Sequence, residues 1–283
     1  MTEQLKELQK EELKILKIFI KICKENKLKY FLVGGSAIGA MRHGGFIPWD
    51  DDIDVAMPRE DYDKFMEIAQ AKLPKHLFLQ TTDTEKNYNL NFNKIRNSKT
   101  TFIEESNLKV DMNQGIFIDI FPLDGIGNES EEIKKSYRKY RVLHEKFRYK
   151  LGQQPKEGLR NKIRNIYYFL ITSFDYLFKN IKTVKDYSKE VHKHCSSIKY
   201  SKSKYIINYC GAYGLRELSQ RSIFASGREV KFEGIKVMVP KKVEKYLTDV
   251  YGDYMKLPPE EKRVAPHFHI LDLEKSYKEY LNK

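Results

Sequence analysis

Cysteine is scarce in this sequence, with 3 among 283 residues. Cys23, Cys195 and Cys210 lie far apart, and none belongs to a C-x-x-C pair. This spacing argues against a zinc knuckle and against a disulfide framework. Two His-x-His pairs, at 192–194 and 267–269, would share a face on a strand, but neither is part of a complete set of zinc ligands at the usual spacing. We therefore do not expect a zinc site.

Long apolar runs are also missing, and no stretch reaches the length of a membrane span. The best candidate, residues 166–178, is aromatic but is interrupted by Thr172, Ser173 and Asp175. It either lies on a membrane surface or packs on the core as an ordinary amphipathic helix. The first residues are rich in Lys and Glu and contain no apolar segment before a small-residue cleavage site. The expected location is the cytoplasm.

Acidic residues are outnumbered, with 39 Asp and Glu against 52 Lys and Arg, which gives a formal net charge of +13. The chain also carries 19 Tyr and 16 Phe. Such a surface suits nucleic acid, an anionic membrane face, or an anionic polymer such as a teichoic acid precursor. Charge alone does not choose among them. A non-catalytic nucleic-acid-binding protein, with strongly salt-dependent binding, is therefore one hypothesis.

The most informative stretch of the chain is a strand, a glycine turn and a second strand within residues 30–57. Gly34 and Gly35 allow a tight turn and a close approach of the backbone to a ligand. Ser36 is expected to cap a helix over residues 37–41, whose N-terminus would bind phosphate. On its own, the Gly-Gly-Ser sequence is more often an ordinary turn than a phosphate site.

Carboxylates recur at every second position where the second strand begins. Asp52 and Asp54 point to the same face of a strand, and two carboxylates at that spacing suit a hard divalent ion such as Mg²⁺. Asp50 has the same parity but falls on the loop that enters the strand. Asp51 is expected to face away or to cap the turn. The alternative for the acidic run is a solvated loop.

A third carboxylate lies inside the apolar strand predicted for residues 115–121. Asp119 is costly to bury there unless it is paired or bound to a metal, so it would complete the site. Asp124 is expected to cap a turn beyond the strand. In the strand predicted for residues 91–96, Lys94 and Arg96 share a face. They would either neutralise a diphosphate or protect a solvated edge strand.

The remaining patterns predict an α/β fold. Helical spacing of apolar residues favours helices at 5–24 and 59–73, alternation favours a hairpin at 228–239, and residues 100–114 read as a mobile connection. A further helix is expected over 243–250 and a polar helical tail from residue 274. The expected organisation is a catalytic core at 1–128, a basic, aromatic helical insertion at 129–204, and a C-terminal part at 205–283 that completes the core.

Three segments of the chain resemble the LicD family: GGSAIGAMRHGGFIPWDDDIDVAMPREDY at 34–62, GIFIDIFPLD at 115–124 and YGDYMKLPP at 251–259. The resemblance implies the nucleotidyltransferase fold, with a mixed sheet, flanking helices and here a mainly helical second lobe. It also implies a phosphotransferase that moves a phospho-alcohol from a CDP-activated donor to a glycan. Known relatives transfer phosphocholine or ribitol phosphate.

The resemblance extends to the site residues and partners. It implies Mg²⁺ or Mn²⁺ held by Asp52, Asp54 and Asp119, with Asp119 or a metal-activated acceptor hydroxyl supplying the nucleophile. The expected substrate-binding residues are Gly34, Gly35, Ser36, Arg42, His43, Lys94 and Arg96. The acceptor would be a glycan, such as lipopolysaccharide or a teichoic acid precursor, or a lipid-linked glycan at the inner membrane surface. Nucleic acid is not expected, because the acidic site would repel it.

A true nucleotidyltransferase remains the alternative within the enzyme class. It would use the same carboxylates but attach a nucleoside monophosphate to a small molecule or protein. The two reactions differ in the product that leaves, which is CMP in the first and pyrophosphate in the second.

Overall fold

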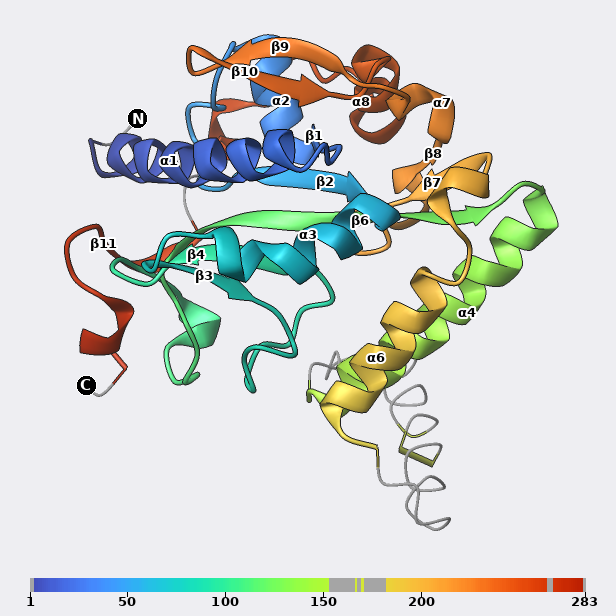
Figure 1. Ribbon diagram of the computed structural model, residues 1–283, viewed down its shortest axis with the longest axis horizontal. Coiled ribbons are helices and arrows are strands. Elements are labelled where there is room, and N and C mark those ends of the chain that lie inside the picture. Colours follow the sequence, from blue (N-terminus) through green and yellow to red (C-terminus); the bar gives the residue numbers. More distant parts are fainter. Residues whose placement is uncertain (1–2, 153–165, 167–168, 171–181, 264–266, 282–283) are drawn as a thin grey trace.

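The computed structural model describes residues 3–152, 166, 169–170, 182–263 and 267–281. At its centre is a mixed sheet in the order β1–β2–β6–β4–β3, with β7 paired to β6 and β8 to β7 (Figure 1). β2 and β6 run parallel, and the other neighbouring strands are antiparallel. The predicted α/β class is confirmed. The strands are β1 Phe31–Leu32, β2 Asp54–Pro58, β3 Leu77–Gln80, β4 Asn93–Asn97, β6 Ile116–Gly127, β7 Tyr205–Ile207 and β8 Leu218–Gln220.

Two long helices cover one face of this sheet. Helix α1 (Glu3–Glu25) and helix α3 (Arg59–Lys72) both contact β6 and each other. Their apolar stripes are buried, and the rings of Phe19 and Phe65 lie 5.0 Å apart between them. Apolar residues at helical spacing therefore produce the helices predicted at 5–24 and 59–73, because each has the sheet to pack against.

A second group of elements lies beyond β1, at the top of Figure 1. Helix α2 follows β1 directly and contacts both the hairpin and α8, while β1 contacts β10. The predicted hairpin is confirmed, with its turn at Glu233 and Gly234. Together these elements form a wall beside the edge of the sheet. They are α2 Gly34–Arg42, α7 Arg221–Phe224, β9 Arg228–Phe232, β10 Ile235–Val239 and α8 Val243–Tyr251.

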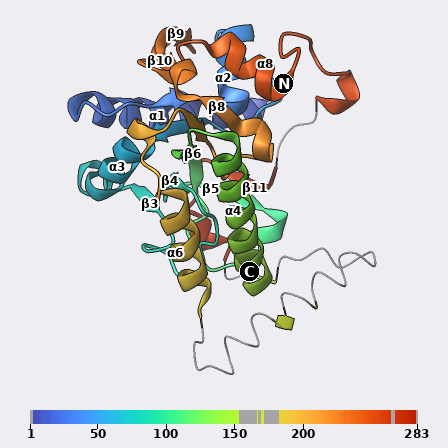
Figure 2. The same cartoon turned by 90° about the vertical axis from the view of Figure 1, so that its right-hand side faces the viewer.

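A pair of helices projects away from the sheet. Helix α4 (Ser130–Lys150) and helix α6 (Val184–Cys195) run side by side, as Figure 2 shows. They share an apolar cluster with the adjoining ends of β6 and β7, in which Tyr140 and Tyr187 are buried. Most of the aromatic run at 166–178 lies outside the described residues. Within the described residues, no helix is both long and apolar enough to cross a membrane. The three-part division of the chain stays a prediction.

The structure differs from the sequence expectations where distant segments pair. Residues 100–114 contain strand β5 (Thr101–Glu104), which pairs with β11 (Phe268–Asp272) near the other end of the chain. The tail predicted to be helical from residue 274 contains only a short 3-10 turn in its described part. The 3-10 turns are η1 Glu105–Asn107, η2 Tyr200–Lys202, η3 Gly214–Glu217, η4 Glu260–Lys262 and η5 Tyr277–Glu279.

Candidate active site

Three carboxylates converge where β2 and β6 lie side by side. Asp54 begins β2, and its register partner on β6 is Asp119. Asp52 precedes the strand by two residues. One carboxylate oxygen from each of the three lies within 4.8 Å of the others, and no other metal-binding group of this kind occurs in the described residues. Parallel pairing of two strands thus brings together acids that are far apart in the sequence.

A cation would stabilise the ionised carboxylates of this cluster. Burial, reinforced by the charges of Asp52 and Asp119, raises the pKa of Asp54 well above its usual value. The same two causes, burial and the neighbouring aspartates, raise the pKa of Asp52 to about 6 and that of Asp50 to about 8. Ionised carboxylates this close repel one another, and their all-oxygen donor set suits a hard ion such as Mg²⁺ or Mn²⁺. The residues present therefore fit the expected metal.

Lys94 forms an ion pair with Asp119, with Nζ and Oδ1 2.6 Å apart. Its strand, β4, lies between β6 and β3, so the alternative of a solvated edge strand is wrong. Burial raises the pKa of Asp119 and lowers that of Lys94, and the ion pair opposes both changes. Lys94 thus stabilises the ionised form of one of the three clustered carboxylates.

Arg96 is used elsewhere in the core. Its guanidinium is buried and donates hydrogen bonds to the side chain of Gln80 and, over 2.7 Å, to the carbonyl of Gly115. It is not among the residues that line the cleft described below. Its predicted contact with phosphate stays a prediction without structural support.

The two glycines of the turn give space to the acids. Gly34 has a φ of +58°, and a Cβ added there would lie 2.4 Å from Oδ2 of Asp54. A Cβ added at Gly35 would lie 2.5 Å from Oδ2 of Asp50. Glycine is therefore required both by the backbone conformation and by the close approach of the two carboxylates to the start of α2.

Ser36 does not cap the helix, so that prediction is wrong. Helix α2 begins at Gly34, the capping position is Val33, and no side chain caps it. Instead, the buried Ser36 hydroxyl accepts a hydrogen bond of 2.8 Å from the backbone N–H of Asp54. Ser36 thereby fixes the start of β2, where Asp54 lies.

The glycines of the turn and the clustered aspartates line a cleft of about 900 Å³. The glycine turn and the acids form one side, and residues from 208 to 267 form the other. Arg42 lines the cleft, and its Nη1 donates a 2.7 Å hydrogen bond to the carbonyl of Tyr254, which ties α2 to the C-terminal segment. His43 is exposed beside the ring of Trp49 and is not part of the lining.

His267 was not predicted as a site residue, although it lines the cleft. Its Nδ1 lies 2.9 Å from Oδ1 of the buried Asp51, and this hydrogen bond raises the pKa of the imidazole. Asp51 therefore holds the C-terminal segment instead of facing away. The two residues are 216 positions apart, so no local pattern indicates their contact. Within the described residues, neither His-x-His pair belongs to a metal-binding cluster.

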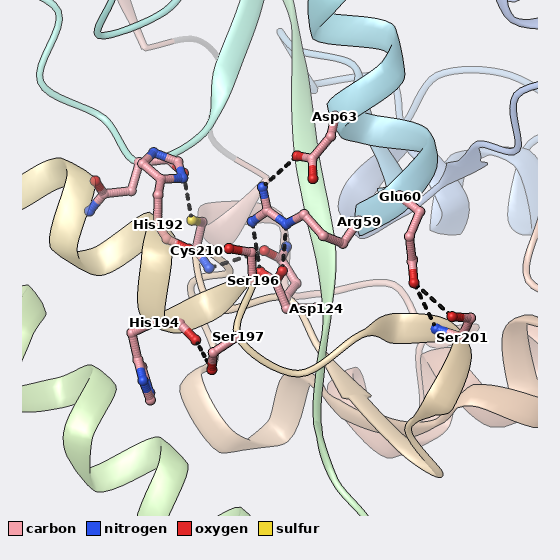
Figure 3. Close-up of polar contacts among 12 residues, drawn as sticks. Arg59, Glu60, Asp63, Asp124, His192, His194, Ser196, Ser197, Ser201 and Cys210 are labelled. Atoms are coloured by element: carbon pink, nitrogen blue, oxygen red, sulfur yellow. Dashed lines mark hydrogen bonds and ion pairs between the residues drawn. The ribbon is translucent and has the colours of Figure 1, made fainter.

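Asp124 does not cap a turn, because β6 continues past it. Arg59 on α3 reaches this buried carboxylate with two hydrogen bonds, Nε to Oδ1 at 2.6 Å and Nη2 to Oδ2 at 3.0 Å (Figure 3). Nη1 of the same guanidinium contacts the more exposed Asp63 at 3.2 Å. The bidentate pair joins α3 to the strand that carries Asp119.

Comparison with known proteins agrees with this geometry. Residues 27–163 match the model of the LicD/FKTN/FKRP nucleotidyltransferase domain. The lipopolysaccharide cholinephosphotransferase LicD of Haemophilus influenzae is 33% identical over 259 residues, which cover 90% of this chain and 92% of that protein. The ribitol 5-phosphate transferases FKRP of Homo sapiens and Mus musculus are each 53% identical over 34 residues, 12% of this chain and 7% of theirs. This chain therefore belongs to the LicD family and is a phosphotransferase of the LicD type.

Proposed function

We propose that this protein transfers phosphocholine from CDP-choline to a hydroxyl of a cell-surface glycan or of its lipid-linked precursor. Two findings support the proposal. The Haemophilus influenzae relative, which matches 90% of the chain, is named as a lipopolysaccharide cholinephosphotransferase. The convergence of Asp52, Asp54 and Asp119 in a large cleft provides a site for the charged diphosphate of such a donor.

Asp52, Asp54 and Asp119 are the proposed ligands of Mg²⁺ or Mn²⁺. When bound, the ion neutralises charge on the donor diphosphate and on the CMP leaving group. The backbone at Gly34 and Gly35 lines the cleft at the N-terminus of α2, where phosphate oxygens are favoured by the helix dipole. Arg42, at the other end of the same helix, adds a positive charge to the cleft.

Asp119 is the proposed proton acceptor. The acceptor hydroxyl would give its proton to this carboxylate while its oxygen forms a bond to the phosphorus that carries choline. The bond from that phosphorus to the CMP oxygen breaks, and CMP leaves. Lys94, 2.6 Å from Asp119, keeps the carboxylate ionised before the transfer.

Identification of the leaving product tests this function. The purified protein is incubated with Mg²⁺, CDP-choline and a lipopolysaccharide or teichoic acid acceptor that lacks phosphocholine, and the nucleotides are separated by chromatography. The proposal predicts CMP and a phosphocholine-labelled acceptor, both lost with chelator and restored by added Mg²⁺. Release of pyrophosphate from CTP, with no CMP from any CDP-alcohol, would instead identify a nucleotidyltransferase.

A further inference from the structure

One part of the cleft is acidic and aromatic and lies apart from the metal-site residues in the sequence. Glu217, at the end of η3, lines the cleft together with Tyr213, Tyr246 and Tyr251. Only 8% of Glu217 is exposed. Neither the predicted site nor the reaction steps above use this carboxylate.

The protein makes room for the Glu217 carboxylate. A Cβ added at Gly211 would lie 2.4 Å from Oε1 of Glu217, so only glycine at that position leaves the carboxylate where it is. Burial raises the pKa of Glu217 to about 7. A hydrogen bond from the Tyr213 backbone and the charge of Arg216 both act to lower this pKa, but by less. Arg216 itself hydrogen-bonds the carbonyl of Val250. Among the described residues, no basic side chain forms an ion pair with Glu217.

Aromatic rings surround the same space. The rings of Tyr213 and Tyr251 pack edge to face with their centroids 5.0 Å apart. Tyr213 is 43% exposed and lines the cleft, and the guanidinium of Arg216 lies over its ring at 5.2 Å from the centroid, which shows that this ring accepts a cation. Tyrosine faces attract cations, and the attraction grows when the cation is also removed from water.

This acidic, aromatic part lies within electrostatic reach of the metal site. Burial is the main cause that raises the pKa of Tyr246 and Tyr251, but the charges of both Glu217 and Asp54 add to it in each case. The Tyr246 hydroxyl also accepts a 3.4 Å hydrogen bond from the backbone N–H of Gly34. Tyr246 thus contacts the start of α2 and lines the same cleft as Glu217.

We propose that Glu217, Tyr213 and Tyr251 form a cation subsite that binds the positively charged end of the donor's alcohol, as a quaternary or primary ammonium. This inference rests on the proposed function and adds the residues that select the alcohol. A cation compensates the cost of a buried carboxylate, whereas a neutral polyol leaves that charge unpaired. The subsite thus favours choline or ethanolamine and disfavours ribitol and glycerol.

Binding of matched donors to two variants tests the subsite. Calorimetry in the presence of Mg²⁺ compares CDP-choline, CDP-glycerol and CMP on the full-length protein. Glu217→Gln, which keeps the size of the side chain, should weaken the binding of CDP-choline at least about tenfold. It should leave the binding of CMP unchanged and should not weaken that of CDP-glycerol, which is relieved of the unpaired charge. Glu244→Gln is the matched control, because Glu244 is exposed and pairs with Arg228 outside the cleft lining.

The aromatic wall has a separate test. Tyr213→Leu should weaken the binding of CDP-choline. Tyr213→Phe, which keeps the ring, should bind CDP-choline as tightly as wild type. The affinity for CMP should be unchanged in both variants. Wild-type protein that binds CDP-glycerol or CDP-ribitol in preference to CDP-choline would overturn the cation subsite but not the phosphotransfer. Equal losses for all three ligands in Glu217→Gln would also overturn it. If no CDP-alcohol binds in a metal-dependent way, the proposed function is overturned as well.

Discussion

Ser36 shows how a single hydroxyl positions one of the three clustered carboxylates, that of Asp54. It is 3% exposed, and its oxygen accepts the backbone hydrogen bond of Asp54. Ser36→Ala leaves a buried N–H without a partner, which should lower the free energy of unfolding by about 1–3 kcal/mol. Denaturant unfolding measures this loss. Ser201→Ala, which removes an exposed hydroxyl that contacts Glu60, is the control and should change stability much less.

The Ser36 result also separates two roles. Loss of donor affinity in Ser36→Ala with an unchanged unfolding free energy would mean that the hydroxyl contacts the ligand directly. The sequence suggested that role, since Ser36 follows two glycines at a helix start. The structure instead predicts a loss of stability as the main effect of Ser36→Ala. The hydroxyl contacts the backbone at Asp54 and is absent from the cleft lining.

Glu217 gives the cation subsite a dependence on pH. Its pKa of about 7 lies well above that of a free glutamate, so the carboxylate is ionised above pH 7 and neutral below it. Affinity for CDP-choline relative to CDP-glycerol should therefore fall about tenfold from pH 8 to pH 6. The charged and titratable groups that influence it or its ring neighbours are Tyr213, Arg216, Tyr246, Tyr251 and Asp54.

The ratio to CDP-glycerol removes the contribution of the proposed metal site, because both ligands carry the same diphosphate. Glu217→Gln provides the second control, since it has no carboxylate to titrate and its ratio should not change with pH. An equal pH dependence of the ratio in wild type and Glu217→Gln would show that another group is responsible.

At the scale of elements, an ion pair joins helix α3 to β6, the strand that carries Asp119. Arg59 and Asp124 are both buried, and their bidentate contact is the polar link between the helix and the strand. Asp124→Asn leaves the arginine charge buried without its partner and should destabilise the protein by about 3–5 kcal/mol. Asp63→Asn removes only the more exposed partner of Arg59 and should lower the free energy of unfolding by at most about 1 kcal/mol.

Chemical unfolding of the two variants compares these costs on one guanidinium. Similar losses in Asp63→Asn and Asp124→Asn would contradict the account, because burial is the difference between the two carboxylates. Arg59→Met combined with Asp124→Leu should be less harmful than Asp124→Asn alone, since it leaves no buried charge.

Elements with strong periodicity were predictable from the sequence, and elements held by distant partners were not. The spacing of Leu8, Ile15 and Phe19 is enough to predict α1, and alternation around Gly234 is enough to predict the β9–β10 hairpin. Strand β5 escaped prediction because its partner β11 lies at the other end of the chain.

The candidate site shows the same division. Asp52 and Asp54 share a short motif, and Asp119 was found because a carboxylate inside an apolar strand needs a partner. No local sequence pattern indicates the contact between Asp51 and His267, because the two residues are 216 positions apart. Glu217 was missed because nothing in its own sequence neighbourhood indicates burial; the space it occupies depends on Gly211.

At the scale of the whole molecule, the cleft is shared between the two ends of the chain. Asp54 and the glycine turn come from the first 60 residues, whereas Tyr254 and His267 come from the last 30 (Figure 1). The Arg42 hydrogen bond to Tyr254 and the Asp51 contact with His267 join the two sides. Ligand bound between them should therefore stabilise the entire fold by mass action.

The central claim is that the three aspartates bind a divalent ion together with a CDP-alcohol. The most direct measurement is the melting temperature of wild type and Asp54→Asn with CDP-choline, each with and without Mg²⁺. We predict an increase that requires both ligands in wild type and is absent from Asp54→Asn, while Asp83→Asn, at an exposed ion pair with Lys185, behaves as wild type. An equal increase without Mg²⁺, or an undiminished one in Asp54→Asn, would contradict the account.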